Sequence, residues 1–193
     1  MPAWLRRIAP ILLTLWVAAV VTGVGSLMGG HLLTLPMPKI DDSVLLSAFA
    51  PRLEKNWLAA HALSLDCGCS RRILDHLLAR GAHSGLDEKV LLLAGTKAMA
   101  DQLASRGYAV ELLDEAQLRK NYQIEAVPLL VIRDPEGRVR YLGGYSERKR
   151  GEIEDVAILT RLMGGEQELA RPAFGCAVGQ ALRDKVDPLG LRN

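Results

Sequence analysis

The sequence predicts an α/β domain, with a central mixed sheet flanked by helices, that follows one N-terminal transmembrane helix. Three observations support this prediction. Residues 8–30 form a long run without a charged residue. The rest of the chain alternates short apolar segments, typical of buried strands, with segments whose apolar residues recur at helical spacing. Two late apolar segments flank the turn Asp134–Gly137, which predicts an antiparallel hairpin beside otherwise parallel strands.

The apolar run at residues 8–30 is predicted to cross a membrane. A helix of this length rises about 35 Å, which is enough for a hydrocarbon core of about 30 Å. Arg6 and Arg7 precede the run, so residues 1–7 are expected in the cytoplasm and the following chain outside it. The predicted location is the inner or plasma membrane, single-pass, with an extracytoplasmic domain. A cleaved signal peptide, with small residues at 23–25, is the alternative and also exports the domain.

The composition narrows the classes of protein and of partner. Residues 31–42, with two prolines, are expected to be a linker, residues 43–165 one domain, and residues 166–193 a C-terminal tail with a short helix. The net charge is +2 and aromatic residues make up 5%, without a basic patch interleaved with aromatics, so nucleic acid is not expected as a partner. Three cysteines are too few for a disulfide framework and indicate a reactive site instead.

The expected elements follow in chain order. Glycines after two of the helices suit their C-terminal caps. The predicted strands are 57–65, 89–94, 108–113, 129–133 and 138–141, and the predicted helices are 43–53, 70–80, 96–106, 115–122, 153–163 and 177–185.

Two motifs resemble the thioredoxin fold. One is HALSLDCGCSRRILDHL, residues 61–77, with a cysteine pair at the first strand-to-helix turn; the other is YQIEAVPLLVIRDPEGRVRYLGGY, residues 122–145, with a Val-Pro pair before the hairpin. The resemblance covers roughly residues 45–165. With the predicted anchor, the chain looks like the tethered thioredoxin-like proteins of bacterial envelopes.

The resemblance assigns a role to each matching position. Cys67 matches the attacking cysteine of the family's Cys-x-x-Cys motif, whereas Ser70 stands where the resolving cysteine would be and Cys69 lies one position early. Pro128 matches the family's cis-proline. His61 falls six residues before Cys67, where many thioredoxins place a buried acid.

The cysteine pair is expected to carry thiol–disulfide chemistry. A cysteine at a helix N-terminus is stabilised as the thiolate, which is the attacking species. Arg71 and Arg72 would add to this effect and Asp66 would oppose it. Gly68 supplies the freedom that a Cys-x-Cys ring needs. The alternatives are an inert buried pair, or a copper(I) or zinc site completed by His61 or His76.

The remaining candidate residues each have two interpretations. His61 is either a satisfied core histidine or a proton acceptor beneath the cysteines. Pro128 is expected to be cis, so that the backbone of Val127 before it can pair with an extended substrate. The alternative is a trans proline that opens an edge strand. Cys176, placed at the start of the tail helix, is either a resolving partner for Cys67 or Cys69 or a buried residue that docks the tail.

Together these features predict a membrane-tethered thiol–disulfide oxidoreductase. Cys67 attacks, Cys69 or Cys176 resolves, Pro128 positions the substrate backbone and His61 transfers protons. The expected partners are thiols or disulfides of exported proteins, a membrane or envelope redox partner, and the lipid bilayer through residues 8–30; neither a cofactor nor a resident metal is expected. The alternatives are a copper-binding or copper-delivery protein and a non-catalytic binding module on the same scaffold.

Overall fold

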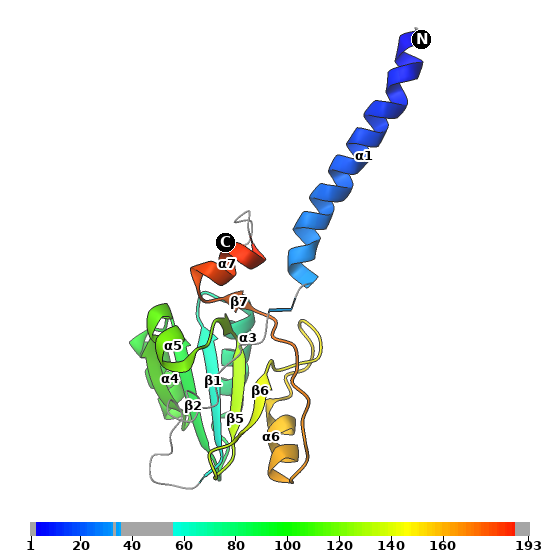
Figure 1. Cartoon of the computed structure of the whole chain (residues 1–193). Coiled ribbons are helices and arrows are strands. Elements are labelled where there is room, and N and C mark those ends of the chain that lie inside the picture. The colour runs from blue at the N-terminus through cyan, green and yellow to red at the C-terminus, as the bar shows by residue number, and fades with distance from the viewer. Residues whose placement is uncertain (1–2, 33, 36–55, 188–193) are drawn as a thin grey trace.

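The computed structural model describes residues 3–32, 34–35 and 56–187 of the chain. The first element is the long helix α1 (Ala3–Leu32), which extends away from the α/β domain (Figure 1). Its segment Ile8–Gly25 has a mean hydropathy of 2.1, is not buried against the protein, and is long and apolar enough to cross a membrane. The predicted helix at residues 43–53 and most of the predicted linker lie outside the described residues.

The core of the domain is a five-stranded mixed sheet in the order β3-β2-β1-β5-β6. Strand β1 is central and pairs parallel with β2 and antiparallel with β5, while β2 and β3 are parallel and β5 and β6 form the predicted hairpin. The bounds are β1 Leu58–Ser64, β2 Asp87–Leu93, β3 Ala109–Leu113, β5 Leu129–Arg133 and β6 Val139–Gly143. The mixed sheet is therefore confirmed, with predicted strand ends correct to about two residues.

Helices cover the sheet at the predicted places. Gly81, at a φ of 73°, ends the first domain helix, and its N–H donates to Leu77 O. Asp114 caps the α5 helix through a capping box with Gln117. The bounds are α3 Gly68–Arg80, α4 Lys97–Ser105, α5 Glu115–Tyr122, α6 Asp155–Met163 and α7 Gln180–Val186. Helix α3 begins two residues earlier than predicted, which places Cys67 at its N-cap.

Two apolar cores lie on the two faces of the sheet. Residues of α3 and α6, such as Leu77 and Ile158, pack on the face that receives Ala59 and Leu63 of β1. Residues of α5, such as Leu118, pack with Ala60 and Ala62 on the other face. The alternation along β1 follows from the period of two in a strand, so His61 belongs to the α3 and α6 face.

A second, two-stranded sheet was not predicted. It joins β4 (Ala126–Val127) to β7 (Cys176–Ala177) of the tail in antiparallel pairing. The prediction that a helix spans 177–185 is corrected here: α7 begins at Gln180, because residues 176–177 pair with β4 before the helix starts. In Figure 1, β7 and α7 lie at the end of the sheet where α3 begins.

Candidate active site

Cys67 stands at the turn between the central strand and the first domain helix. Its N–H donates to Ser64 O at 3.2 Å, and its carbonyl accepts the N–H of Arg71 at 3.0 Å as the helix begins. The side chain is 1% exposed. A thiol at this place is close to the unpaired N–H groups at the start of α3, which favour the thiolate.

The sulfur of Cys67 is surrounded by hydrogen-bond donors. The Cys176 thiol contributes most to lowering the pKa of Cys67 far below the ordinary value of 9.0, followed by the Cys69 thiol, while burial acts in the opposite direction. The backbone N–H of Ser70 also donates to this sulfur. The Cys67 sulfur itself lies 3.7 Å from Val127 O. Cys176, more than a hundred residues further along the chain, thus joins the neighbouring Cys67 and Cys69 at one point.

The pKa of Cys69 is shifted in the opposite direction from that of Cys67. Its hydrogen bond to Cys67 and its own partial burial raise the pKa of the Cys69 thiol well above the ordinary value of 9.0. Lys149 and Arg150 act against this rise, because their positive charges favour a thiolate at Cys69. The directions of the two pKa shifts therefore favour the thiolate at Cys67 over the thiolate at Cys69. Lys149 and Arg150 are about eighty residues from Cys69 in the sequence, so only the fold connects them with the site.

Cys176 lies opposite Val127 in the register of β4 and β7. The prediction that Cys176 sits at a helix N-terminus is wrong, because the residue belongs to a strand and α7 starts only at Gln180. The tail approaches β4 very closely: a Cβ at Gly175 would lie 1.9 Å from Val127 O and 2.5 Å from Pro128 Cδ. Only glycine fits there without displacing the tail.

The peptide bond between Val127 and Pro128 is cis, as predicted. Val127 is 2% exposed, and its strand is covered by the tail. A cleft of about 880 Å³ lies between the two, with Asp66, Cys67 and Val127 on the domain side and Cys176 and Arg183 on the tail side. The backbone position predicted to receive a substrate strand is thus next to Cys67, and the chain itself occupies it.

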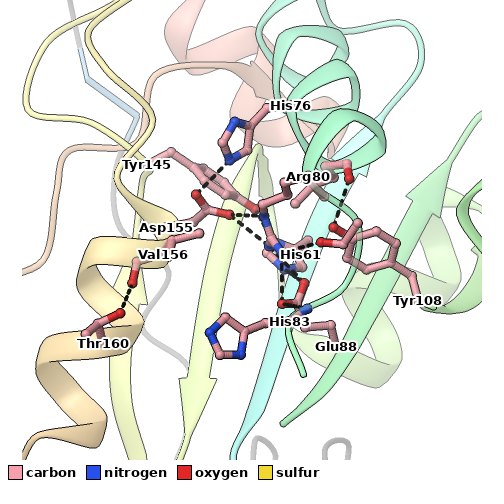
Figure 2. Close-up of polar contacts among 12 residues, drawn as sticks. His61, His76, Arg80, His83, Glu88, Tyr108, Tyr145, Asp155, Val156 and Thr160 are labelled. Atoms are coloured by element: carbon pink, nitrogen blue, oxygen red, sulfur yellow. Dashed lines mark hydrogen bonds and ion pairs between the residues drawn. The ribbon is translucent and has the colours of Figure 1, made fainter. Parts of the chain in front are cut away.

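His61 lies in a buried polar cluster on the α3 and α6 face of the sheet (Figure 2). Its Nδ1 is 2.9 Å from the Tyr145 hydroxyl, and its Nε2 is 3.4 Å from Glu88 Oε2. Cys67 packs with the core of the opposite face. These contacts favour the interpretation of His61 as a satisfied core histidine, and the proton-acceptor role remains a prediction.

Arg80 links the acidic members of this polar cluster, which we define as His61, His76, Arg80, Glu88, Tyr145 and Asp155. Arg80 donates to Glu88 Oε2 at 2.8 Å and to Asp155 Oδ2 at 3.0 Å, while His76 lies 2.9 Å from Asp155 Oδ1 (Figure 2). Burial alone would raise the pKa of Glu88, but hydrogen bonds with His61 and Arg80 outweigh it and hold that pKa at about 2. Arg80 and Glu88 therefore form an ion pair at the centre of an internally bonded network.

A metal site was one alternative for the cysteines. Within residues 3–32, 34–35 and 56–187, no group of three or more His, Cys, Asp or Glu side chains is arranged to hold a metal ion. His76, a candidate ligand, is paired with Asp155. The arrangement that the described side chains do form is a thiolate with two neighbouring thiols.

The domain has a thioredoxin-like fold: a central mixed sheet flanked by helices, a cysteine turn after the central strand, and a cis-proline that precedes the hairpin. No protein-family model and no curated protein matches the chain.

Several solved structures are similar to the chain. An uncharacterised conserved protein of Geobacillus kaustophilus is 14% identical, covering 64% of this chain and 77% of its own, with a TM-score of 0.49. A thiol-disulfide isomerase of Corynebacterium glutamicum is 15% identical over 72% of this chain and 95% of its own, with a TM-score of 0.38. StoA of Bacillus subtilis is 12% identical over 47% of this chain and 75% of its own, with a TM-score of 0.35.

Proposed function

We propose that the chain is a membrane-tethered thiol–disulfide oxidoreductase that acts on exported proteins through Cys67 and Cys69. The observation that carries the proposal is the position of Cys67: it lies at the N-cap of α3, its sulfur is 3.7 Å from the carbonyl of the cis Val127–Pro128 bond, and the Cys69 and Cys176 thiols hydrogen-bond to that sulfur, which lowers the pKa of Cys67 while that of Cys69 is raised. One sulfur is thereby ready to attack at neutral pH, while the other keeps its proton until it is needed.

The reaction begins when the Cys67 thiolate attacks a substrate disulfide. A bond forms between Cys67 and one substrate sulfur, and the other substrate sulfur leaves as a thiolate. A second thiol of the protein, Cys69 or Cys176, then loses its proton and attacks the Cys67 sulfur. This step releases the remaining substrate thiolate, which takes up a proton, and leaves a disulfide in the protein. The two electrons that reduce the substrate come from the two protein thiols, and a membrane or envelope redox partner restores them.

The tether is proposed from α1. Residues 8–25 are exposed throughout and apolar, and Arg6 and Arg7 favour a cytoplasmic N-terminus. The reactive domain then lies on the outer side of an inner or plasma membrane, where disulfides persist. Val127 and Pro128 position the backbone of a substrate segment beside Cys67.

Thiol mapping tests this function. The full chain in detergent is equilibrated across a glutathione redox series and alkylated, and the state of each cysteine is identified by mass spectrometry. Reversible conversion of Cys67 from thiol to disulfide, with Cys69 or Cys176 as partner, is the expected result. If all three cysteines remain reduced across the series, or are protected only after copper is added, the oxidoreductase assignment is overturned in favour of a binding or copper-handling protein.

A further inference from the structure

The C-terminal tail is bound at the thiol site as an added strand. Residues 166–187, here called the tail, cross the domain and pair with β4 through only two residues, Cys176 and Ala177. The next N–H, that of Val178, donates to Glu125 O at 2.7 Å and continues the pairing. The backbone positions at which an added strand would bind β4 are thus filled by the chain itself.

The register of this pairing places a cysteine where a substrate cysteine would react. Cys176 faces Val127, whose carbonyl is 3.7 Å from the Cys67 sulfur, and the Cys176 thiol donates a hydrogen bond to that same sulfur. Cys67 is 1% exposed. A disulfide presented on a strand paired with β4 therefore cannot reach Cys67 while the tail fills that position.

The fit at Gly175 adds a chemical requirement. Because a Cβ at this position would lie 1.9 Å from Val127 O, a strand bound in this register needs glycine immediately before its cysteine. Any segment that replaces the tail in the same pairing meets the same carbonyl.

We propose that residues 175–177 occupy the strand position in which substrate proteins bind, and that an exported polypeptide with a Gly-Cys sequence displaces them to reach Cys67. This inference rests on the proposed oxidoreductase function and defines its substrate class. Displacement is feasible because the paired strands are short. Other contacts would keep the tail near the domain: Arg171 binds Glu154 at 3.0 Å, and the N–H of Gly144 donates to Arg171 O at 2.8 Å. After Cys67 has attacked the substrate disulfide, Cys176 returns to the site and attacks the Cys67 sulfur, which releases the substrate and restores the pairing of the tail with β4.

Two variants with a matched control test whether the tail blocks access to Cys67. Gly175→Ala is expected to expel the tail from β4, and Leu182→Ala, which removes a side chain 7% exposed between the tail helix and Ala126, is expected to loosen it. Gly164→Ala is the control, because a Cβ there would meet its nearest atom, Arg161 O, at 3.3 Å, a tight contact that a shift of a few tenths of an ångström relieves and that lies outside the pairing of β4 with β7. The measured quantity is the rate of Cys67 alkylation by iodoacetamide in the full chain, taken at the high-pH plateau where the thiol pKa no longer matters.

We expect the plateau rate to rise at least about tenfold in Gly175→Ala, less in Leu182→Ala, and not at all in Gly164→Ala. The reason is that a pairing of two residues on each strand opens at low free-energy cost once the close contact between residue 175 and Val127 is lost. Thermal melting of each variant shows that the domain remains folded. Equal plateau rates in all folded variants and the parent protein would overturn the proposal, since the tail would then not be the cover.

The sequence requirement is tested with two peptides in mixed disulfide with glutathione. One is ARPAFGCAVG, the sequence of residues 170–179, and the other carries alanine in place of its glycine. Attack of Cys67 on the peptide sulfur releases glutathione, which is measured directly. In the Gly175→Ala protein the glycine peptide should react about tenfold faster than the alanine peptide; equal rates would refute the Gly-Cys substrate class. Faster alkylation without glutathione release from either peptide would instead overturn the oxidoreductase function.

Discussion

The polar cluster around Arg80 and the thiol site around Cys67 lie on opposite faces of the same sheet, and they are held in opposite ways. Glu88, 4% exposed, is bound by Arg80 through two hydrogen bonds of 3.0 and 2.8 Å and also accepts the N–H of His83 at 3.0 Å. The thiol site is closed by a pairing of two residues on each strand and by hydrogen bonds between sulfurs. The first region links α3 and α6 to the sheet through ion pairs, whereas the second is the one that we propose opens and exchanges partners.

The two regions differ in what surrounds their buried ionisable groups. Both regions contain strongly shifted pKa values, but Cys67 lines a cleft of about 880 Å³, whereas Glu88 and Asp155 are buried against Arg80. In the polar cluster each charge meets an opposite charge, so the shift reflects structural pairing. At the cysteines the lowered pKa belongs to the proposed nucleophile, and its hydrogen-bond partners are thiols, which can form a disulfide with it.

The largest effect is expected from Cys67→Ser. Loss of the attacking thiolate should reduce glutathione release from a mixed disulfide by at least about a thousandfold, because a hydroxyl does not replace a thiolate in disulfide exchange. The melting temperature should change little, since serine has nearly the same shape. Cys69→Ser is the comparison variant: it should still form the mixed disulfide and fail, at most, in its resolution. Turnover retained by Cys67→Ser and lost in Cys69→Ser would reverse the assignment of the two cysteines.

Arg80→Ala should have the largest effect on stability. It leaves Glu88 and Asp155, each less than 5% exposed, without their common cation, and breaking a buried ion pair costs about 3–5 kcal/mol. Urea unfolding of the domain provides the measurement. Arg71→Ala, an exposed arginine of the same helix, should change the free energy of unfolding by less than about 0.5 kcal/mol. Similar losses in both variants would show that the network does not stabilise the fold.

Acidification should weaken the polar cluster in a defined range. The pKa of Glu88 is about 2 in the folded protein, against an ordinary value of 4.5. A depressed carboxyl pKa stabilises the folded state above pH 4.5, and this contribution is lost as the pH falls from there toward about 2. Chemical unfolding measured across this range should show a steeper loss in the parent protein than in Glu88→Gln. The exposed Glu166→Gln should retain the parent slope, and identical slopes in all three proteins would contradict the paired state of Glu88.

Much of the fold could be predicted because local patterns determine it. The apolar segment at β1, the Gly81 cap and the turn Asp134–Gly137 each fixed an element within about two residues. The cysteine turn and the cis-proline followed from motif resemblance. The pairing of the tail with β4 could not be predicted, because two-residue strands carry almost no pattern and their partners lie about fifty residues apart. The effect of Lys149 and Arg150 on Cys69 could not be predicted either, because the charge effect depends on a distance that only the fold determines.

The smallest expected effect concerns the link between the tail and the nucleophile. Cys176→Ala removes the hydrogen bond that contributes most to the low pKa of Cys67, so this pKa should rise by about one unit. Cys176→Ser is the matched variant, because its hydroxyl still donates and should preserve most of the lowering. The pH dependence of Cys67 alkylation measures both. A midpoint that rises in Cys176→Ala and not in Cys176→Ser would show that the tail tunes the nucleophile by hydrogen bonding. If the two variants shift equally, the tail instead acts by covering the site, and the thiol at position 176 matters only as a resolving sulfur.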